Sequence, residues 1–223
     1  MKKKQFILFL TFITLLAIVF SAISIKAGQQ ESIYLVYLDP GHGGFDGGAT
    51  SIDKYTIEKD ITLTTCYFLK SYLEKTGIKV KLTRTKDEAL AKSKKDDIHK
   101  RVKLINDSHC DVYVSIHANA YPASVVKGSQ TFYNESKKEN LHLASNIMKQ
   151  LQMADSTNQR VEKSISGKYL LDHTTKIGCL VELGFLTNPT DLENLKNEKY
   201  LQKISFYIYL GIIQYFEESR SYG

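Results

Sequence analysis

Cysteine is scarce in this sequence of 223 residues, and its three cysteines do not pair by spacing. Cys66, Cys110 and Cys179 form no C-x-x-C motif and are odd in number, which argues against a disulfide framework. Cys179 lies in an apolar run with no base beside it, so it is a poor candidate for a nucleophile. We expect all three to be small residues of the core.

The sequence also lacks the motifs of phosphate-binding and nucleic-acid-binding proteins. The glycine-rich residues 41–48 match neither G-x-x-x-x-G-K-[ST] nor G-x-G-x-x-G at a helix start. The formal net charge is +6, but residues 1–28 carry four lysines and no acidic residue, which leaves 26 basic against 24 acidic residues elsewhere. No basic stripe interleaved with aromatic residues is present, so we expect no nucleic-acid partner.

The N-terminal segment, residues 1–28, has the composition of a targeting sequence. Lysines at positions 2–4 precede an uncharged, mostly apolar run from Phe6 to Ile25, which is close to the ~20 residues that span a bilayer. The residues before Ala27 form a poor cleavage site, which favours a retained membrane anchor over a cleaved signal. Positive residues stay on the cytoplasmic side, so we expect the rest of the chain to be extracytoplasmic in either case, whether anchored or secreted.

Residues 29–223 are expected to form one catalytic domain, because this length suits one full-sized core and no repeat or linker divides it. Strand-like and helix-like patterns alternate along it. Strands are expected at residues 33–39, 78–83, 111–117, 129–133 and 178–183, and helices at residues 57–75, 97–108, 137–153 and 200–216, with a further helix opened by Asn188-Pro189. The alternation predicts an α/β fold: a single three-layer domain with a mostly parallel, twisted sheet of about six strands and helices on both faces.

Two polar segments interrupt this pattern. Residues 154–168 show no periodicity, and we expect a surface loop of unusual length there. Residues 92–103 carry charges of both signs, including Arg101, which is typical of a solvated loop that enters a helix. We favour that interpretation over an electrostatic dock for an anionic wall polymer or an acidic protein.

Two histidines and two glutamates, His42, Glu58, His117 and Glu182, lie at or near the ends of the expected strands. Their separations in the sequence fit no single helix, but ligand sites in parallel sheets form outside the carboxyl ends of the strands. Two imidazoles and one carboxylate are the ligand set of an open catalytic zinc. The sequence therefore predicts a zinc site at the carboxyl ends of the strands, with the remaining acid free for proton transfer.

The strings that carry these residues are LDPGHGG, IEKDITL, VSIHANA and VELGFLTN, with Thr83-Arg84 after the second expected strand. Together they resemble the zinc-dependent N-acetylmuramoyl-L-alanine amidases of bacterial cell-wall metabolism, over roughly residues 33–216. The single-domain architecture is most similar to the CwlD-like branch that acts in the spore cortex of endospore formers. The resemblance implies one zinc ion held by His42, Glu58 and His117, with Glu182 as the catalytic acid and base.

The resemblance also implies a function. The enzyme would hydrolyse the amide bond between N-acetylmuramic acid and the L-alanine of the stem peptide in peptidoglycan. In the spore cortex, between the forespore membranes, this is the first step to muramic-δ-lactam, upstream of a polysaccharide deacetylase. We also consider an activating envelope lipoprotein as a partner, because the chain has no wall-binding module. The alternatives are a zinc exopeptidase acting on free peptides and a non-catalytic peptidoglycan-binding or scaffold protein.

Three further residues are candidates for supporting roles. Asp39 is expected either to orient His42 through its second ring nitrogen or to cap the turn. Asn119 is a candidate substrate contact. Arg84 is expected to make a structural ion pair or, less favoured, to bind a carboxylate of the stem peptide.

Overall fold

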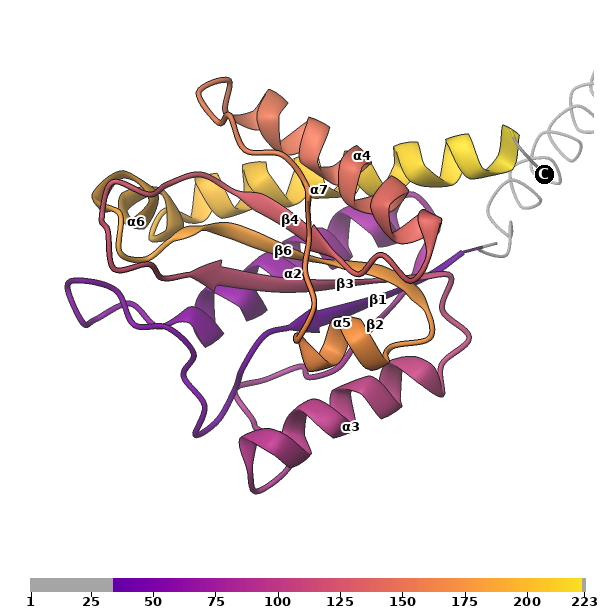
Figure 1. Cartoon of the computed structure of the whole chain (residues 1–223), viewed down its shortest axis with the longest axis horizontal. Coiled ribbons are helices and arrows are strands. Elements are labelled where there is room, and N and C mark those ends of the chain that lie inside the picture. Colours follow the sequence, from indigo (N-terminus) through magenta and orange to yellow (C-terminus); the bar gives the residue numbers. More distant parts are fainter. Residues whose placement is uncertain (1–33, 222–223) are drawn as a thin grey trace, which may run out of the picture. The chain divides into compact units, whose positions relative to one another are not determined.

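A computed structural model describes residues 34–221 of the chain; the expected signal or anchor at residues 1–28 lies outside the described residues. The described part contains a six-stranded sheet with the order β2-β1-β3-β6-β4-β5 (Figure 1). The strands are β1 (Leu35–Pro40), β2 (Lys79–Leu82), β3 (Val112–Asn119), β4 (Gln130–Tyr133), β5 (Lys163–Ser164) and β6 (Ile177–Phe185).

The sheet is mostly parallel, as expected. β1, β2, β3 and β6 run in one direction, whereas β4 pairs antiparallel with β6 and β5 pairs parallel with β4. The carboxyl ends of β1, β3 and β6, three neighbouring strands, therefore meet at one edge of the sheet.

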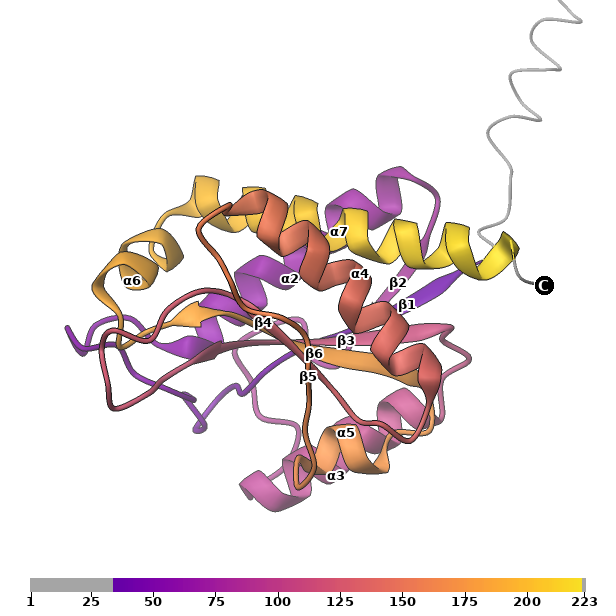
Figure 2. The ribbon, with the colours of Figure 1, turned by 45° about the horizontal axis from the view of Figure 1, so that its top comes forward.

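Helices cover both faces of the sheet, which confirms the three-layer prediction. The helices α2 (Glu58–Lys75), α4 (Lys138–Ala154) and α7 (Glu198–Ser221) pack on one face, and α3 (Lys94–Asn106) and the short α5 (Tyr169–His173) pack on the other (Figure 2). The remaining helix of the described chain, α6 (Pro189–Leu195), contacts β6 and α7. It begins as the sequence predicts, with Pro189 in its first turn and the Asn188 side chain accepting a hydrogen bond from the Asp191 N–H.

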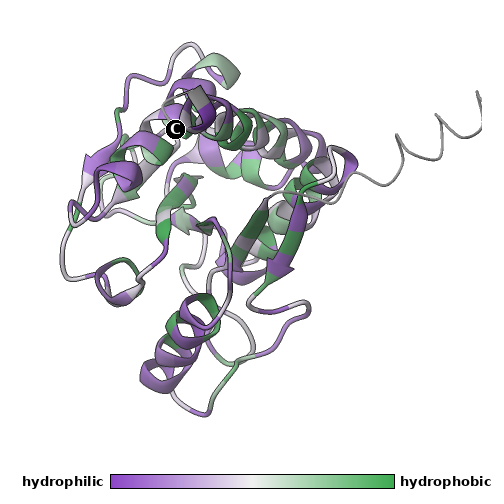
Figure 3. Ribbon diagram, turned by 90° about the vertical axis from the view of Figure 1, so that its right-hand side faces the viewer, coloured by the Kyte–Doolittle hydropathy of each residue, from purple (hydrophilic) through white to green (hydrophobic). Residues whose placement is uncertain are grey.

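Side chains of the strands alternate between two cores, because successive residues of a strand point to opposite faces. Val36, Val114 and Val181 belong to the larger core under α2, α4 and α7. Tyr37 and Leu180 belong to the smaller core, which α3 and α5 cover. In Figure 3 the strands carry both hydrophobic and hydrophilic residues, and the helices change from hydrophobic to hydrophilic around their axes. All three cysteines are buried and free, as expected of small core residues.

The expectation of a plain surface loop at residues 154–168 is wrong in part. The segment passes from α4 on one face to α5 on the other (Figure 1), and it contributes the edge strand β5 on the way. The Asn158 side chain is buried and donates hydrogen bonds to the backbone carbonyl and the hydroxyl of Ser129. A strand of two residues leaves no periodicity in the sequence, which explains why the pattern did not reveal it.

No helix between residues 34 and 221 combines the length and the apolar character that a membrane span requires.

A glycine in α7 gives a test of the packing between α4 and α7. A Cβ atom at Gly211 would lie 2.5 Å from the Ile147 Cα atom. Helix propensity alone would make Gly211→Ala stabilising by about 1 kcal/mol. Overpacking against a rigid backbone costs about 1–3 kcal/mol, so we expect a net loss in the free energy of unfolding.

Urea denaturation measures this change. Gln202→Ala on the same helix is the control, and its effect should stay within about 0.5 kcal/mol because Gln202 is partly exposed. A Gly211→Ala protein that is more stable than the wild type would contradict the packing described here.

Candidate metal centre

The sheet brings the four predicted site residues together. His42 follows β1, His117 lies near the end of β3, and Glu182 is its direct neighbour across the β3–β6 pairing. Glu58 is the first residue of α2, which packs against β1 and β3. Parallel strand direction thus places residues that are far apart in the sequence at one edge of the sheet.

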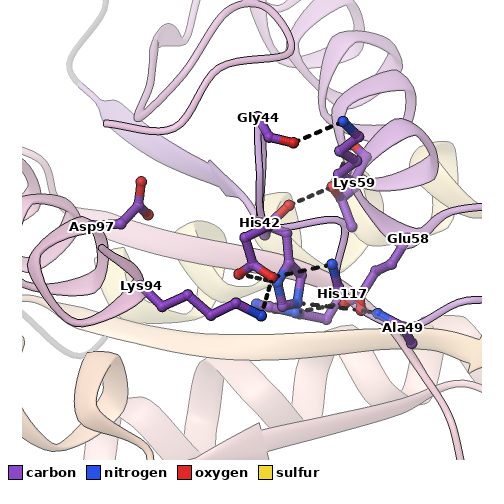
Figure 4. A network of polar contacts seen from close by, with 12 residues as sticks. His42, Gly44, Ala49, Glu58, Lys59, Lys94, Asp97 and His117 are labelled. Carbon is purple, nitrogen blue, oxygen red and sulfur yellow. Dashed lines mark hydrogen bonds and ion pairs between the residues drawn. The ribbon is translucent and has the colours of Figure 1, made fainter. Parts of the chain in front are cut away.

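Three of these side chains form a compact cluster. His42, Glu58 and His117 each offer one possible ligand atom, and these atoms lie within 4.8 Å of one another. His42 Nε2 is 3.2 Å from one Glu58 carboxylate oxygen, and His117 Nδ1 is 2.8 Å from the other. Figure 4 shows the two rings and the carboxylate converging. The donor set matches that of an open zinc site, which uses nitrogen and oxygen ligands and leaves one position vacant.

The glycine-rich turn after β1 allows this close approach. A Cβ atom at Gly41 would lie 2.4 Å from the His117 ring, and one at Gly48 would lie 2.5 Å from a Glu58 carboxylate oxygen. His42 itself has a φ angle of 62°, in the left-handed region that side chains other than glycine rarely adopt. The glycines therefore make room for the candidate ligands. The turn directs the His42 ring toward Glu58, and the positive φ angle of His42 makes this conformation costly in free energy.

Two buried arginines hold the turn in this conformation. Arg84 donates hydrogen bonds to the carbonyl oxygens of Pro40 and Gly41, at 3.1 and 3.0 Å. Arg101 donates to the carbonyl oxygens of Pro40 and His42, at 2.7 and 2.5 Å. Both side chains are almost fully buried, with exposed fractions of 2% and 3%. Each guanidinium group thus donates to backbone carbonyl oxygens of the turn, which need hydrogen-bond partners when they are buried.

This arrangement corrects two expectations. Arg84 is a structural residue, but it donates to the Thr62 hydroxyl and to backbone carbonyls, including those of Lys59 and Lys86, rather than to a carboxylate. Its side chain is buried and is not exposed to a substrate. Arg101 is not a solvated residue of a mixed-charge run: it forms ion pairs with Asp39 and Asp97 in the interior. A charged helix face can carry one inward arginine when the sheet supplies carbonyl and carboxylate partners.

The carboxylate that contacts the His42 ring belongs to Asp46, not to Asp39 as one sequence-based expectation had it. The Asp39 carboxylate accepts hydrogen bonds from Thr83, Ser115 and Arg101, and it does not contact the His42 ring. The ring nitrogen of His42 that faces away from Glu58, Nδ1, lies 2.8 Å from the Asp46 carboxylate. Lys94 pairs with the same carboxylate at 2.6 Å. Asp46 therefore orients His42, and Asp39 belongs to the Arg101 network that secures the turn.

The cluster is electrostatically arranged to bind positive charge. Burial alone would raise the pKa of Glu58, but hydrogen bonds and charge interactions with His117 and His42 hold that pKa well below its usual range. Burial would lower the pKa of His42, whereas its contacts with Glu58 and Asp46 raise it. The N–H groups of Ala49 and Ala118 also donate to the Glu58 carboxylate. Glu58 therefore stays ionised and attracts a cation, whether a proton on the imidazoles or a metal ion.

Glu182 stands apart from this hydrogen-bonded group. Its Oε2 atom is enclosed and has no hydrogen-bond partner among the described residues. Burial raises the pKa of Glu182 to about 7, while the nearby His117 opposes the shift. A carboxyl group with a pKa near neutrality is suited to accept and return a proton.

An open cleft of about 430 Å³ exposes these groups to solvent. The ends of β3 and β6 form its floor, and the segment around α5 forms one wall; Asn119, Lys168 and Tyr169 are among its lining residues. The Asn119 side-chain oxygen accepts a hydrogen bond from the Ala120 N–H. Asn119 is thus accessible from the cleft, as a substrate contact requires.

The sequence could have indicated two residues of the site that we did not identify there. Asp46 lies four residues after His42 within the same glycine-rich turn. Arg101 lies three residues after Ile98 and four before Ile105, on the helix face that packs toward the sheet. In both cases the spacing is visible in the sequence, but only the folded turn shows which partner each residue contacts.

The fold and the cluster define a class: an α/β enzyme with a candidate metal centre at the carboxyl ends of parallel strands. Comparison with known proteins identifies the family. The chain matches the N-acetylmuramoyl-L-alanine amidase family, Amidase_3, over residues 36–214. The chain belongs to this family. The resemblance noted in the sequence is thereby confirmed, and it favours an amidase over the exopeptidase and scaffold alternatives.

Individual relatives support the same assignment. The germination-specific N-acetylmuramoyl-L-alanine amidase of Bacillus subtilis is 41% identical, covering 82% of this chain and 80% of its own length. The CwlD amidase of Clostridioides difficile, solved in complex with the GerS lipoprotein, has a TM-score of 0.79 at 36% identity, covering 82% of this chain and 98% of that one. An N-acetylmuramoyl-L-alanine amidase from Clostridium difficile 630 has a TM-score of 0.77 at 29% identity, covering 84% and 98%.

The buried Arg101 network provides a stability test. Arg101→Leu would leave Asp39 charged and unpaired in the interior, which typically costs about 3–5 kcal/mol. Lys100→Leu is the matched control, because Lys100 is its exposed neighbour on the same helix and should change stability by less than about 1 kcal/mol. Chemical denaturation of both variants measures the difference, and equal effects would show that Arg101 does not secure the turn.

Proposed function

We propose that the chain is a zinc-dependent N-acetylmuramoyl-L-alanine amidase that separates the stem peptide from muramic acid in peptidoglycan. One observation carries the proposal: three nitrogen and oxygen donors lie within 4.8 Å of one another beside an enclosed, unpartnered carboxylate oxygen. The first group suits a metal ion, and the second suits a proton-transfer residue.

The described residues fit a zinc ion on the chemistry of the donor set. His42 and His117 would supply imidazole nitrogens and Glu58 a carboxylate oxygen, and two neutral imidazoles with one carboxylate leave the ion a net positive charge. Asp46 would fix the ring orientation and tautomer of His42. A zinc ion bound there would polarise the scissile carbonyl and lower the pKa of water to roughly 7.

A side chain of the protein, Glu182, would then carry out the proton transfer. Glu182 would accept it from the attacking water and return it to the departing amine of L-alanine, a role typically worth ~10²–10⁴-fold in rate. The contrast between the two glutamates supports this division. Glu58 is held ionised by its histidine and backbone partners, whereas burial leaves Glu182 free to change protonation state near neutral pH.

We further propose a role in the spore cortex, where removal of the peptide is the first step to muramic-δ-lactam and a polysaccharide deacetylase acts next. The germination-specific amidase of Bacillus subtilis supports this placement by its name and by its 41% identity. An envelope lipoprotein is the proposed partner, because the similar CwlD amidase was solved with the GerS lipoprotein.

The proposed location follows from the substrate. The enzyme would act outside the cytoplasm, in a sporulating cell between the forespore membranes, with residues 1–28 as a membrane anchor or a cleaved signal. The relatives include cell-wall amidases, among them a probable cell wall amidase of Staphylococcus aureus that is 34% identical. Fractionation of sporulating cells with an antibody to the catalytic domain would distinguish an anchored from a released form.

One experiment should distinguish the metal ligands from the proton-transfer residue by their effects on zinc content and on activity. His42→Ala and His117→Ala should lose bound zinc and lose activity, whereas Glu182→Gln should keep its zinc and lose at least ~10²-fold in kcat. Zinc content is measured by elemental analysis, and activity by mass spectrometry of stem peptide released from peptidoglycan. His142→Ala, which removes a histidine paired with Glu218 between α4 and α7, is the control and should keep both.

Two results would count against the assignment. A fully active Glu182→Gln enzyme would remove the proton-transfer role. Wild-type enzyme that cleaves free peptides as readily as muropeptides would favour the exopeptidase alternative.

Asp46 should affect zinc affinity without binding the ion. Asp46→Asn weakens the contact that orients His42, and losses of such contacts typically reduce metal affinity ~10–100-fold. Competition with a chromogenic chelator measures the dissociation constant. Asp53→Asn is the control, because Asp53 pairs with Lys196 instead of a histidine. An unchanged affinity in Asp46→Asn would show that the turn alone positions the ring.

A further inference from the structure

Most cations around the cleft already have acceptors within the protein. Arg84 and Arg101 are buried and bind the turn after β1. Lys94 pairs with Asp46 at 2.6 Å, and Lys59 pairs with Asp87 at 2.7 Å. Each of these groups therefore serves the structure of the site, and none is available to bind an anionic ligand.

Lys168 is different. It lines the cleft together with Glu58, His117 and Glu182, and its side chain is exposed. Within residues 34–221 its ammonium group has no hydrogen bond or ion pair to another side chain or carbonyl. Its positive charge also acts on the site, because Lys168 is one of the groups that lower the pKa of Glu182 against the larger effect of burial.

The backbone around Lys168 is held firmly, so the side chain projects from a fixed point. Leu170 and Leu171 are buried in the smaller core. The Gly167 N–H donates to Asp172 at 2.8 Å. The Tyr169 ring is stacked between His99 and His173, with centroid distances of 4.4 and 3.9 Å. A cation on such a platform loses less conformational entropy on binding than one on a mobile loop.

The substrate of the proposed function supplies the matching group. Stem peptides carry carboxylates close to the bond that is cleaved, and the cleft already contains the carboxylates of Glu58 and Glu182. The metal ion would offset the charge of Glu58 at the scissile amide, so a peptide carboxylate further along the cleft would need a cation of its own. Electrostatic complementarity of this kind selects substrates by charge.

We propose that Lys168 is a specificity-determining residue that binds the carboxylate of the second stem residue, and so selects muropeptides in which this carboxylate is free. This inference rests on the proposed amidase function and deepens it. It gives Lys168 the substrate contact that the sequence had suggested for Arg84, which is buried and occupied.

The test compares two muropeptides that differ only at the second stem residue, one with free carboxylates and one with the corresponding amides. The zinc-loaded full chain should prefer the free acid by about 5- to 20-fold in kcat/KM, as expected for one partly exposed charge-assisted hydrogen bond. Lys168→Met should lose this preference, mainly through a higher KM for the free acid, because the contact lies away from the reacting atoms. Lys168→Arg should retain it.

Lys163→Met is the matched control, because Lys163 is an exposed lysine of the same segment that does not line the cleft. It should keep the wild-type preference. The pH profile of kcat is measured in parallel, since a lysine that only tunes Glu182 would shift this profile and change both substrates equally.

The outcomes separate the inference from the function on which it rests. If the wild type cleaves both muropeptides equally, or if Lys168→Met keeps the wild-type preference, the inference is wrong and the amidase function stands. An equal loss on both substrates with a shifted pH profile would also overturn it. If the wild type releases no stem peptide from either muropeptide or from peptidoglycan, the proposed function itself fails.

Discussion

The hydrogen bonds from Arg84 and Arg101 to the carbonyl oxygens of residues 40–42 are the contact on which the rest of the site depends. They fix a turn in which His42 has a positive φ angle, and without that turn the imidazole would not face Glu58. Two guanidinium groups in the interior are costly to desolvate, so they persist only where acceptors are numerous. Asp39, Asp97 and the backbone carbonyls at the end of β1 supply those acceptors.

The same edge of the sheet gives its two glutamates opposite properties. Glu58 begins a helix and receives two backbone N–H groups and two imidazoles, which favour its charged form. Glu182 lies on β6 with an enclosed oxygen that has no hydrogen-bond partner within residues 34–221, and burial favours its neutral form. Environments that separate the pKa values of paired carboxyl groups commonly assign one to structure or binding and the other to proton transfer.

The sequence predicted the features that depend on periodicity and strand direction. The sheet, its helices on both faces and the meeting of His42, Glu58, His117 and Glu182 follow from apolar runs whose ends hold polar residues. It could not predict contacts that depend on the path of a turn, such as the choice of Asp46 over Asp39 as the partner of His42. Arg101 was misread because its charge suggested solvent, while its helical position faced the sheet. β5 was missed because two residues form no pattern.

The brevity of that last strand has a consequence for how the protein behaves while it folds. Edge strands expose unpaired backbone groups that can recruit another chain, and proteins limit this hazard with short or charged edges. This sheet has both devices: β5 spans two residues at one margin, and β2 spans four at the other, with Lys79 and Lys81 on it. A six-stranded sheet built this way offers little template for intermolecular pairing, which protects against aggregation.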